Sequence, residues 1–237
     1  MQQAESRTSR AVIRVLVVED HTVVRQALCM LLADARYGLE VVGEAGDGVE
    51  AVALAQTLRP DVIVMDLFMP RMGGVAATQA ILRQNPGARV LVLTSDEDDT
   101  DAVAAIQAGA LGFVSKRASV DELVRTLHSV ALDHLVVPRA LAARLAAATP
   151  ETSAQPALST LTARELEVLA CLARGLGNRE IARTLEISTA TVRTHISHLL
   201  PKLGAANRTQ AAVRARGLDV PGNRQGEKDN RWSDKDL

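Results

Sequence analysis

The sequence predicts an α/β domain built on a doubly wound parallel sheet, followed by a smaller all-α domain. Two observations support this prediction. Short apolar runs alternate with helix-like segments over residues 11–132, whereas residues 161–218 contain only helix-like patterns. Between them, residues 148–160 (ATPETSAQPALST) are rich in Pro, Ser, Thr and Ala, which is typical of a flexible linker.

The apolar runs of the first domain are expected to be the strands of one sheet. Strands that alternate with helices are joined by right-handed crossovers, which make the sheet parallel. Five strands fit the flavodoxin-like order 2-1-3-4-5. The expected strands cover residues 11–18, 39–44, 61–65, 88–93 and 111–114, and the expected helices cover residues 22–33, 48–58, 75–84, 100–108 and 119–132.

The remaining segments complete the expected domain organisation. Residues 133–160 are expected to hold one more helix, over residues 138–147, and the linker. Residues 161–220 form the expected second domain. The tail at residues 221–237 has too few apolar side chains to pack, so we expect it to be disordered.

The composition is that of a globular cytoplasmic protein. With 47% apolar residues among 237, the chain can bury a core in each of two domains. No run approaches the roughly 18–20 apolar residues of a membrane span, and the polar start lacks the apolar centre of a signal peptide. Cys29 and Cys171 lie in separate helical patterns, so neither a zinc site nor a disulfide is expected.

The net charge of −1 conceals an uneven distribution. Residues 1–147 hold 14 Lys and Arg against 18 Asp and Glu, while residues 148–220 hold 9 against 6. A basic second domain suits contact with a polyanion, but so small an excess does not by itself identify a nucleic-acid-binding protein.

Polar side chains follow four of the apolar runs, where strands are expected to end. Glu19 and Asp20 follow the first run, Asp66 the third, Thr94 the fourth and Lys116 the fifth. The carboxyl ends of parallel strands converge on one crevice, so these residues are expected to share a pocket. Carboxylates that lie so close repel one another unless a hard cation such as Mg²⁺ lies among them. A phosphoryl group on one carboxylate would be neutralised by that metal, by the ammonium and by the hydroxyl.

These residues stand in motifs that resemble the receiver domain of two-component response regulators. The motifs are VVEDH at 17–21, DLFMPRMGG at 66–74, LTS at 93–95 and GFVSK at 112–116. The resemblance covers residues 11–132. It implies that Asp66 accepts a phosphoryl group from a phosphohistidine of a sensor histidine kinase.

The same resemblance implies roles for the neighbouring residues. It implies that Lys116 and Thr94 bind the phosphoryl oxygens. The Mg²⁺ ligands that it implies are Glu19, Asp20, Asp66 and the backbone carbonyl of Phe68.

Phe113 and Phe68 bear on how the implied phosphorylation would be sensed and how long it would last. Phe113 occupies the position of an aromatic that rotates inward in this family, and because it lacks a hydroxyl, a switch there must work by packing. Phe68, the second residue after Asp66, is expected to slow hydrolysis of the acyl phosphate. Phe68 also argues against an aspartate-nucleophile phosphatase of the haloacid-dehalogenase type, which needs a second Asp at that position. We therefore do not expect an enzyme.

In the second domain, an apolar stripe predicts a helix over residues 189–203 (TATVRTHISHLLPKL). Ser188 is suited to cap this helix, and residues 178–187 (NREIARTLEI) supply a preceding helix, as in a helix-turn-helix. A small helical bundle with a solvated face fits the same pattern. The residues expected to face a core at helical spacing are Val192, Ile196, Leu199 and Leu203.

Residues 161–212 resemble the LuxR-type helix-turn-helix through their whole length, and this resolves the ambiguity. It implies that the helix from about residue 189 enters the major groove of double-stranded promoter DNA. Arg193, Thr194 and Ser197 are expected to reach base edges, since an Arg there could make a bidentate contact to guanine. The residues assigned to DNA phosphates are Arg179, Lys202 and Arg208.

Pro201 departs from the LuxR-type pattern, which usually has a basic or polar residue late in the recognition helix. Proline removes the amide bond toward Ser197 and can cost about 3 kcal/mol inside a helix. We predict a kink or an early end of the helix near residues 199–201.

Together, the two resemblances identify a response regulator of the NarL/FixJ type, in which phosphorylation controls a DNA-binding domain and thereby transcription. They imply that the unphosphorylated receiver masks the helix-turn-helix, and that activation releases it to form a homodimer on paired half-sites. RNA polymerase is a further partner that this class allows, and no membrane partner is expected. A DNA-binding regulator whose receiver responds to a partner or ligand without phosphorylation stays open as an alternative.

Overall fold

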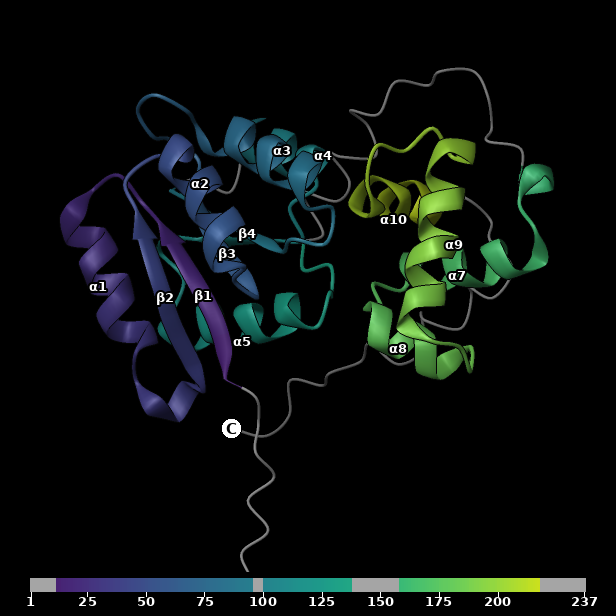
Figure 1. Ribbon diagram of the computed structural model, residues 1–237, viewed down its shortest axis with the longest axis horizontal. Helices are drawn as coiled ribbons and strands as arrows, with labels where there is room; N and C mark the ends of the chain where they lie inside the picture. Colours follow the sequence, from purple (N-terminus) through teal and green to yellow (C-terminus); the bar gives the residue numbers. More distant parts are fainter. Residues whose placement is uncertain (1–11, 96–99, 138–157, 218–237) are drawn as a thin grey trace, which may run out of the picture.

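The computed structural model describes residues 12–95, 100–137 and 158–217 (Figure 1). The first domain contains a five-stranded parallel sheet in the order β2-β1-β3-β4-β5, which confirms the predicted topology. The strands are β1 (Ile13–Val18), β2 (Leu39–Ala45), β3 (Val62–Asp66), β4 (Val90–Thr94) and β5 (Gly112–Ser115). The helices of this domain are α1 (Thr22–Leu32), α2 (Gly48–Leu58), α3 (Gly74–Gln84), α4 (Thr100–Ala108) and α5 (Val120–Ala131).

Helices cover both faces of the sheet because successive side chains of a strand point to opposite faces. In β1, Leu16 and Val18 pack with apolar residues of α2, α3 and α4. Val15 and Val17 pack with apolar residues of α1 and α5. All four valine and leucine side chains are fully buried. Polar groups can therefore gather only at the ends of the strands.

The second domain is a group of helices packed around one core. The apolar stripe predicted for α9 is buried in that core, as expected. Ser188 caps α9, since its hydroxyl accepts a hydrogen bond of 3.0 Å from the Thr191 amide. The helices are α7 (Ala163–Ala173), α8 (Asn178–Thr184), α9 (Thr189–Lys202) and α10 (Arg208–Gly217).

Pro201 does not end α9 where the sequence predicted. The helix runs through Lys202, so an early end at residues 199–201 is wrong. Pro201 lies in the last turn, and beyond it the Leu203 amide still donates to the Leu199 carbonyl at 3.0 Å. Because proline has no amide hydrogen, α9 lacks only the hydrogen bond from residue 201 to the Ser197 carbonyl. The last turn of the helix stays closed.

Some predicted segments lie outside the described residues, among them the helix at residues 138–147, most of the linker and the tail at residues 221–237. Two 3₁₀-helices were not predicted, η1 (Ala35–Tyr37) and η2 (Leu158–Thr160). Within the described part of the chain, no helix is long and apolar enough to cross a membrane.

The two domains contact each other where α10 lies beside α4 (Figure 1). The side-chain amides of Asn207 and Gln210 donate to the backbone carbonyl of Gln107 at 2.9 and 2.7 Å. A second contact joins the segment after α5 to α8, where His134 Nε2 lies 2.6 Å from Glu180 Oε2. These contacts hold the second domain against the first.

Candidate functional site

The polar residues predicted to share a pocket come from the carboxyl ends of four strands. Glu19 follows β1, Asp66 ends β3, Thr94 ends β4 and Lys116 follows β5. Glu19, Asp66 and Thr94 are buried despite their polarity. The Lys116 amide donates to the Thr94 carbonyl at 2.7 Å, which ties the ends of β4 and β5 together.

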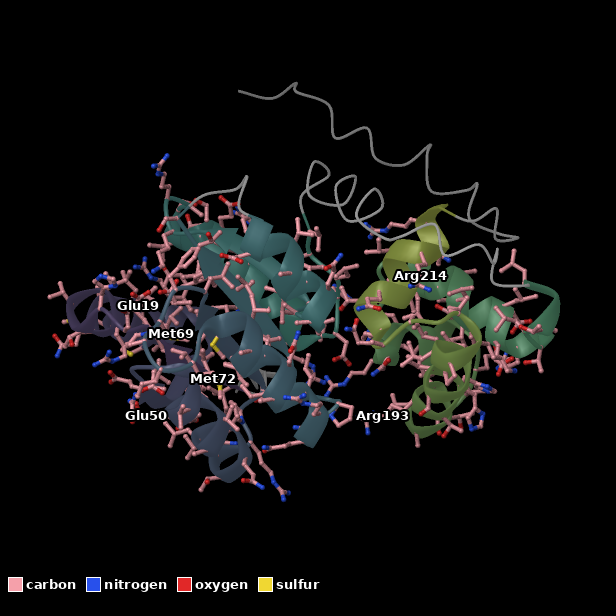
Figure 2. All side chains as sticks on the ribbon, turned by 90° about the horizontal axis from the view of Figure 1, so that it is seen from above. Glu19, Glu50, Met69, Met72, Arg193 and Arg214 are labelled. Carbon is pink, nitrogen blue, oxygen red and sulfur yellow. The ribbon has the colours of Figure 1, made fainter. Side chains whose placement is uncertain are left out.

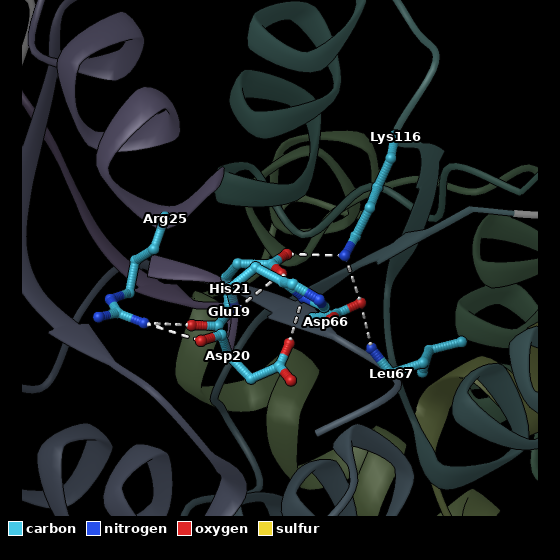
Figure 3. Close-up of polar contacts among 7 residues, drawn as sticks. All are labelled: Glu19, Asp20, His21, Arg25, Asp66, Leu67 and Lys116. Carbon is cyan, nitrogen blue, oxygen red and sulfur yellow. Dashed lines mark hydrogen bonds and ion pairs between the residues drawn. The ribbon is translucent and has the colours of Figure 1, made fainter. Parts of the chain in front are cut away.

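Lys116 lies between two of the buried carboxylates (Figure 3). Its Nζ atom is 2.7 Å from Glu19 Oε2 and 3.0 Å from Asp66 Oδ1. The backbone amide of Leu67 also donates to Asp66 Oδ1, at 2.9 Å. One oxygen of Asp66 is thus held by two donors that come from different strands.

Burial and hydrogen bonding at this site shift the pKa values of Asp66 and Lys116. Burial raises the pKa of Asp66, the hydrogen bond from Lys116 opposes this, and the charge of Glu19 raises it again. Burial alone would lower the pKa of Lys116, but its hydrogen bonds to Glu19 and Asp66 outweigh burial and raise it. Lys116 is therefore a charged ammonium placed directly against the Asp66 carboxylate.

The acidic pair at the end of β1 forms, with His21, a group of side chains that could hold a metal ion. One ligand atom from each of Glu19, Asp20 and His21 lies within 4.8 Å of the others. His21 Nδ1 is 3.1 Å from Glu19 Oε1 and 2.8 Å from Asp20 Oδ1. His21 is also the N-cap residue of α1, where its side chain makes no capping hydrogen bond.

The donor set at this acidic pair fits a hard divalent cation. The atoms Glu19 Oε2 and Asp20 Oδ1 are buried, with Lys116 Nζ 2.7 Å from the former and His21 Nδ1 2.8 Å from the latter. Three carboxylates, with Asp66, face a single permanent ammonium, so the site retains negative charge. Oxygen ligands with excess negative charge are what Mg²⁺ prefers.

Sequence reasoning missed Arg25, which supports the acidic loop from α1 (Figure 3). Its Nη1 atom donates to the backbone carbonyl of Glu19 at 2.6 Å and lies 3.5 Å from that of Asp20. Its Nε atom is 3.4 Å from Glu44 Oε2 on β2. The only signal in the sequence was a basic residue in the second turn of the helix that follows the acidic pair.

The loop after Asp66 is held by close backbone packing. A Cβ atom on Gly74 would lie 2.1 Å from the Asp66 carbonyl oxygen, so only glycine fits there. Arg71, in the left-handed conformation with φ 63°, forms an ion pair with Asp47, the N-cap of α2. The loop that follows Asp66 is therefore fixed to α2 as well as to β3.

The two phenylalanines differ in environment. Phe113, on β5, is buried in the core that packs against α2, α3 and α4. Phe68 is 55% exposed beside the Asp66 site. Phe113 therefore already occupies an inward position, whereas Phe68 is exposed to solvent beyond the carboxyl end of β3.

The outward face of α9 carries the side chains predicted to contact bases. Arg193, Thr194 and Ser197 are exposed, and the Thr194 hydroxyl donates to the Ala190 carbonyl at 3.2 Å. Arg179, at the start of α8, is exposed too. These side chains therefore lie outside the core of the second domain.

Two residues assigned to DNA phosphates are engaged within the protein. Lys202 Nζ lies 2.8 and 2.7 Å from the two carboxylate oxygens of Glu165. Arg208 donates to Asn178 Oδ1 at 3.2 Å and to the Leu176 carbonyl at 2.9 Å. Their role toward DNA stays a prediction, and in this structure both of them support the second domain.

Comparison with known proteins follows the same division into two domains. Residues 15–128 match the response regulator receiver domain, and residues 159–215 match the bacterial regulatory proteins of the luxR family. The chain thus belongs to the two-component response regulators, with a receiver domain followed by a LuxR-type DNA-binding domain, and it controls transcription.

Individual relatives match along most of the chain. The transcriptional regulatory protein LiaR of Bacillus subtilis is 40% identical over 205 residues, which cover 86% of this chain and 96% of LiaR. The activator DevR/DosR of Mycobacterium tuberculosis is 41% identical over 207 residues, covering 87% and 95%. A solved LuxR-family response regulator from Aurantimonas sp. SI85-9A1 is 34% identical with a TM-score of 0.53, covering 58% of this chain and 97% of that one. This protein is therefore similar to the NarL/LuxR type of response regulator.

Proposed function

We propose that Asp66 accepts a phosphoryl group from the phosphohistidine of a sensor histidine kinase, and that this controls DNA binding by the second domain. The observation that supports the acceptor role is the position of Lys116, whose Nζ atom bridges Asp66 Oδ1 and Glu19 Oε2. An ammonium in that place neutralises charge on the transferred group.

In the proposed transfer, a carboxylate oxygen of Asp66 attacks the phosphorus atom. A new O–P bond forms, the P–N bond to the histidine of the kinase breaks, and the electron pair leaves with the imidazole, which takes up a proton. Glu19, Asp20, Asp66 and the Phe68 carbonyl would hold Mg²⁺, which supplies positive charge for the phosphoryl oxygens when bound. Lys116 and Thr94 would bind those oxygens from the β5 and β4 side.

The DNA-binding half of the proposal concerns α9. Arg193, Thr194 and Ser197 would reach base edges, and Arg179, Lys202 and Arg208 would contact phosphates. In the present arrangement Arg193 and Ser197 line the cleft that faces the receiver. DNA recognition would then require the two domains to separate, which phosphorylation of Asp66 would favour. A homodimer would place two such helices on paired half-sites.

The experiment compares DNA binding with and without a small phosphodonor and Mg²⁺. A binding duplex is first selected from random sequences with the full-length protein, because the operator is not encoded in the chain. Treatment with the phosphodonor is expected to raise the affinity of the wild type and to leave Asp66→Asn unchanged. Equal responses of the two proteins would refute control through Asp66.

We also place the protein in the cytoplasm, since its DNA partner lies there.

A further inference from the structure

A cavity of about 650 Å³ lies between the two domains, away from the phosphorylation site. The receiver contributes the end of α3, the loop before β4 and the end of α4, while the second domain contributes α9 and the start of α10. Figure 2 shows Arg193 at this boundary, reaching from α9 toward the receiver. A volume of roughly 300–1,000 Å³ is typical of sites for small molecules.

The charge around this cavity is strongly one-sided. Arg83 and Arg89 come from the receiver and Arg193 and Arg208 from the second domain, while Asp133 is the one acidic residue in the lining. Asp133 is already paired, since its Oδ1 atom lies 2.5 Å from Arg89 Nε. Three guanidinium groups therefore surround the cavity with no carboxylate partner among its lining residues.

Arg208 is the most constrained of the three. Within the described residues its guanidinium bonds only to the Asn178 side chain and the Leu176 carbonyl, both neutral. Burial lowers the pKa of Arg208, the charge of Asp133 raises it and the charge of Arg89 lowers it again. Arg208 is half-buried, and the Asp133 carboxylate whose charge acts on it is already paired with Arg89, so an anion entering the cavity would add a charge partner for Arg208.

The uncharged part of the lining suits a ligand with several acceptor oxygens. Asn207, Gln107 and Ser197 add polar groups around the guanidinium cluster, and Leu82 and Ile196 form an apolar wall. Guanidinium groups bind phosphate through two parallel hydrogen bonds, so three of them can hold a ligand with more than one phosphate. A singly charged ion would leave most of this positive charge unmatched.

We propose that this interdomain cleft is a binding site for a small molecule that carries two or more phosphate groups. Such a ligand touches Arg83 of the receiver and Arg193 of α9 at the same time, so it holds the domains in the arrangement described above. Because Arg193 is also a proposed base-contacting residue, the bound ligand opposes DNA binding. That consequence rests on the proposed function, whereas ligand binding itself does not.

The test uses tripolyphosphate as the probe and isothermal titration calorimetry on the full-length protein. Chelator replaces Mg²⁺, and NaCl keeps the ionic strength constant, so that the phosphorylation site does not contribute. The wild type is expected to bind one tripolyphosphate per chain. Arg83→Gln and Arg193→Gln are each expected to weaken binding about three- to tenfold, as loss of one charged contact to phosphate does.

The control is the double variant Arg125→Gln/Arg183→Gln, which removes one exposed arginine from each domain outside the cavity. Its affinity for tripolyphosphate is expected to match that of the wild type. Equal weakening in this control would mean general attraction to positive charge. An effect of Arg193→Gln without an effect of Arg83→Gln would mean binding to the DNA face alone. Either result, or no binding by the wild type, would overturn the proposal.

The effect on DNA is measured separately, so that the two proposals can fail independently. Tripolyphosphate at saturation is expected to lower DNA affinity in the wild type, and to do so less in Arg83→Gln, whose DNA-binding face is intact. Binding in the calorimeter without this difference would leave the site in place and refute only its link to DNA recognition.

Discussion

Lys202, at the end of α9, is joined to Glu165, in the first turn of α7, by two contacts of 2.8 and 2.7 Å from its Nζ atom. Glu165 is buried and also accepts a hydrogen bond of 2.8 Å from the Thr162 amide. The ion pair therefore fastens α9 to α7, the first helix of its domain. This makes the orientation of α9 depend on a charge pair as well as on the apolar core.

The pH dependence of the second domain's stability is expected to reflect Glu165. The hydrogen bonds from Lys202 and the Thr162 amide lower the pKa of Glu165 from 4.5 to about 2. Because the pKa of Glu165 is lower in the folded state, its charged carboxylate stabilises the fold fully when the pH is above the ordinary pKa of 4.5. This stabilisation is lost as the pH falls from 4.5 toward 2. Glu165→Gln should therefore lower the free energy of unfolding at neutral pH by about 2 kcal/mol, because Glu165 is buried in this pair while Lys202 is partly exposed.

Thermal unfolding followed by circular dichroism measures this effect. The difference in Tm between the wild type and Glu165→Gln is expected to shrink as the pH falls from 4.5 toward 2. Glu167→Gln is the control, because Glu167 lies on the same helix but half-exposed, in a surface pair with Arg164. A Tm difference that stays constant over this pH range would show that the Glu165 charge is not stabilising.

Arg25 is expected to set the affinity of the acidic loop for Mg²⁺. Its guanidinium holds the backbone carbonyl of Glu19, and so fixes the direction in which the Glu19 and Asp20 side chains leave the loop. Loss of a group that orients metal ligands typically weakens metal binding by about 10-fold or more. Calorimetric titration of Arg25→Gln with Mg²⁺ should show this loss, and Arg125→Gln, on the exposed face of α5, should not. An unchanged Mg²⁺ affinity in Arg25→Gln would remove its positioning role.

Gly74 is expected to be intolerant of even one methyl group. In Gly74→Ala the new Cβ would lie 2.1 Å from the Asp66 carbonyl oxygen, which is backbone and cannot turn away. The resulting displacement should cost roughly 1–3 kcal/mol in urea unfolding, as overpacking usually does. Gly87→Ala is the matched control, because its nearest neighbour is the Asn85 side chain at 3.4 Å. Equal stability of the two variants would contradict the close packing of this loop.

Phe68 is expected to lengthen the lifetime of the phosphoryl group. Phe68 is 55% exposed and lies two residues after the buried Asp66, where a bulky side chain is expected to hinder the approach of water. Phe68→Ala should shorten the phosphoryl half-life a few-fold, which corresponds to less than 1.4 kcal/mol of barrier. Phe68→Leu keeps most of the bulk and should stay near the wild type. If the half-life is the same in all three proteins, Phe68 does not shield the acyl phosphate.

The sequence predicted the strand order and the gathering of Asp66 and Lys116, because both follow from parallel topology alone. The carboxyl ends of parallel strands lie at the same end of the sheet, so Asp66 after β3 and Lys116 after β5 are brought to that end whatever residue types stand there. Arg25 could not be predicted in the same way, since its role depends on a side chain that reaches backbone carbonyls of a loop. The contact of Asn207 with Gln107 depends on how two domains dock, which no periodicity in either domain encodes.

Pro201 shows a different limit. Proline is costly inside a helix, but α9 has only one residue after Pro201. The last turn is still closed by the bond from the Leu203 amide to the Leu199 carbonyl, so the helix does not end before the proline.

The central claim is that Asp66 is the phosphoryl acceptor, and it can be tested by locating the phosphoryl group itself. The full-length protein is treated with a small phosphodonor and Mg²⁺, reduced with borohydride to convert the acyl phosphate to a stable product, and mapped by peptide mass spectrometry. The wild type is expected to carry the modification at Asp66 alone, and Asp66→Asn to carry none. Modification of Asp66→Asn, or of another carboxylate in the wild type, would contradict the account.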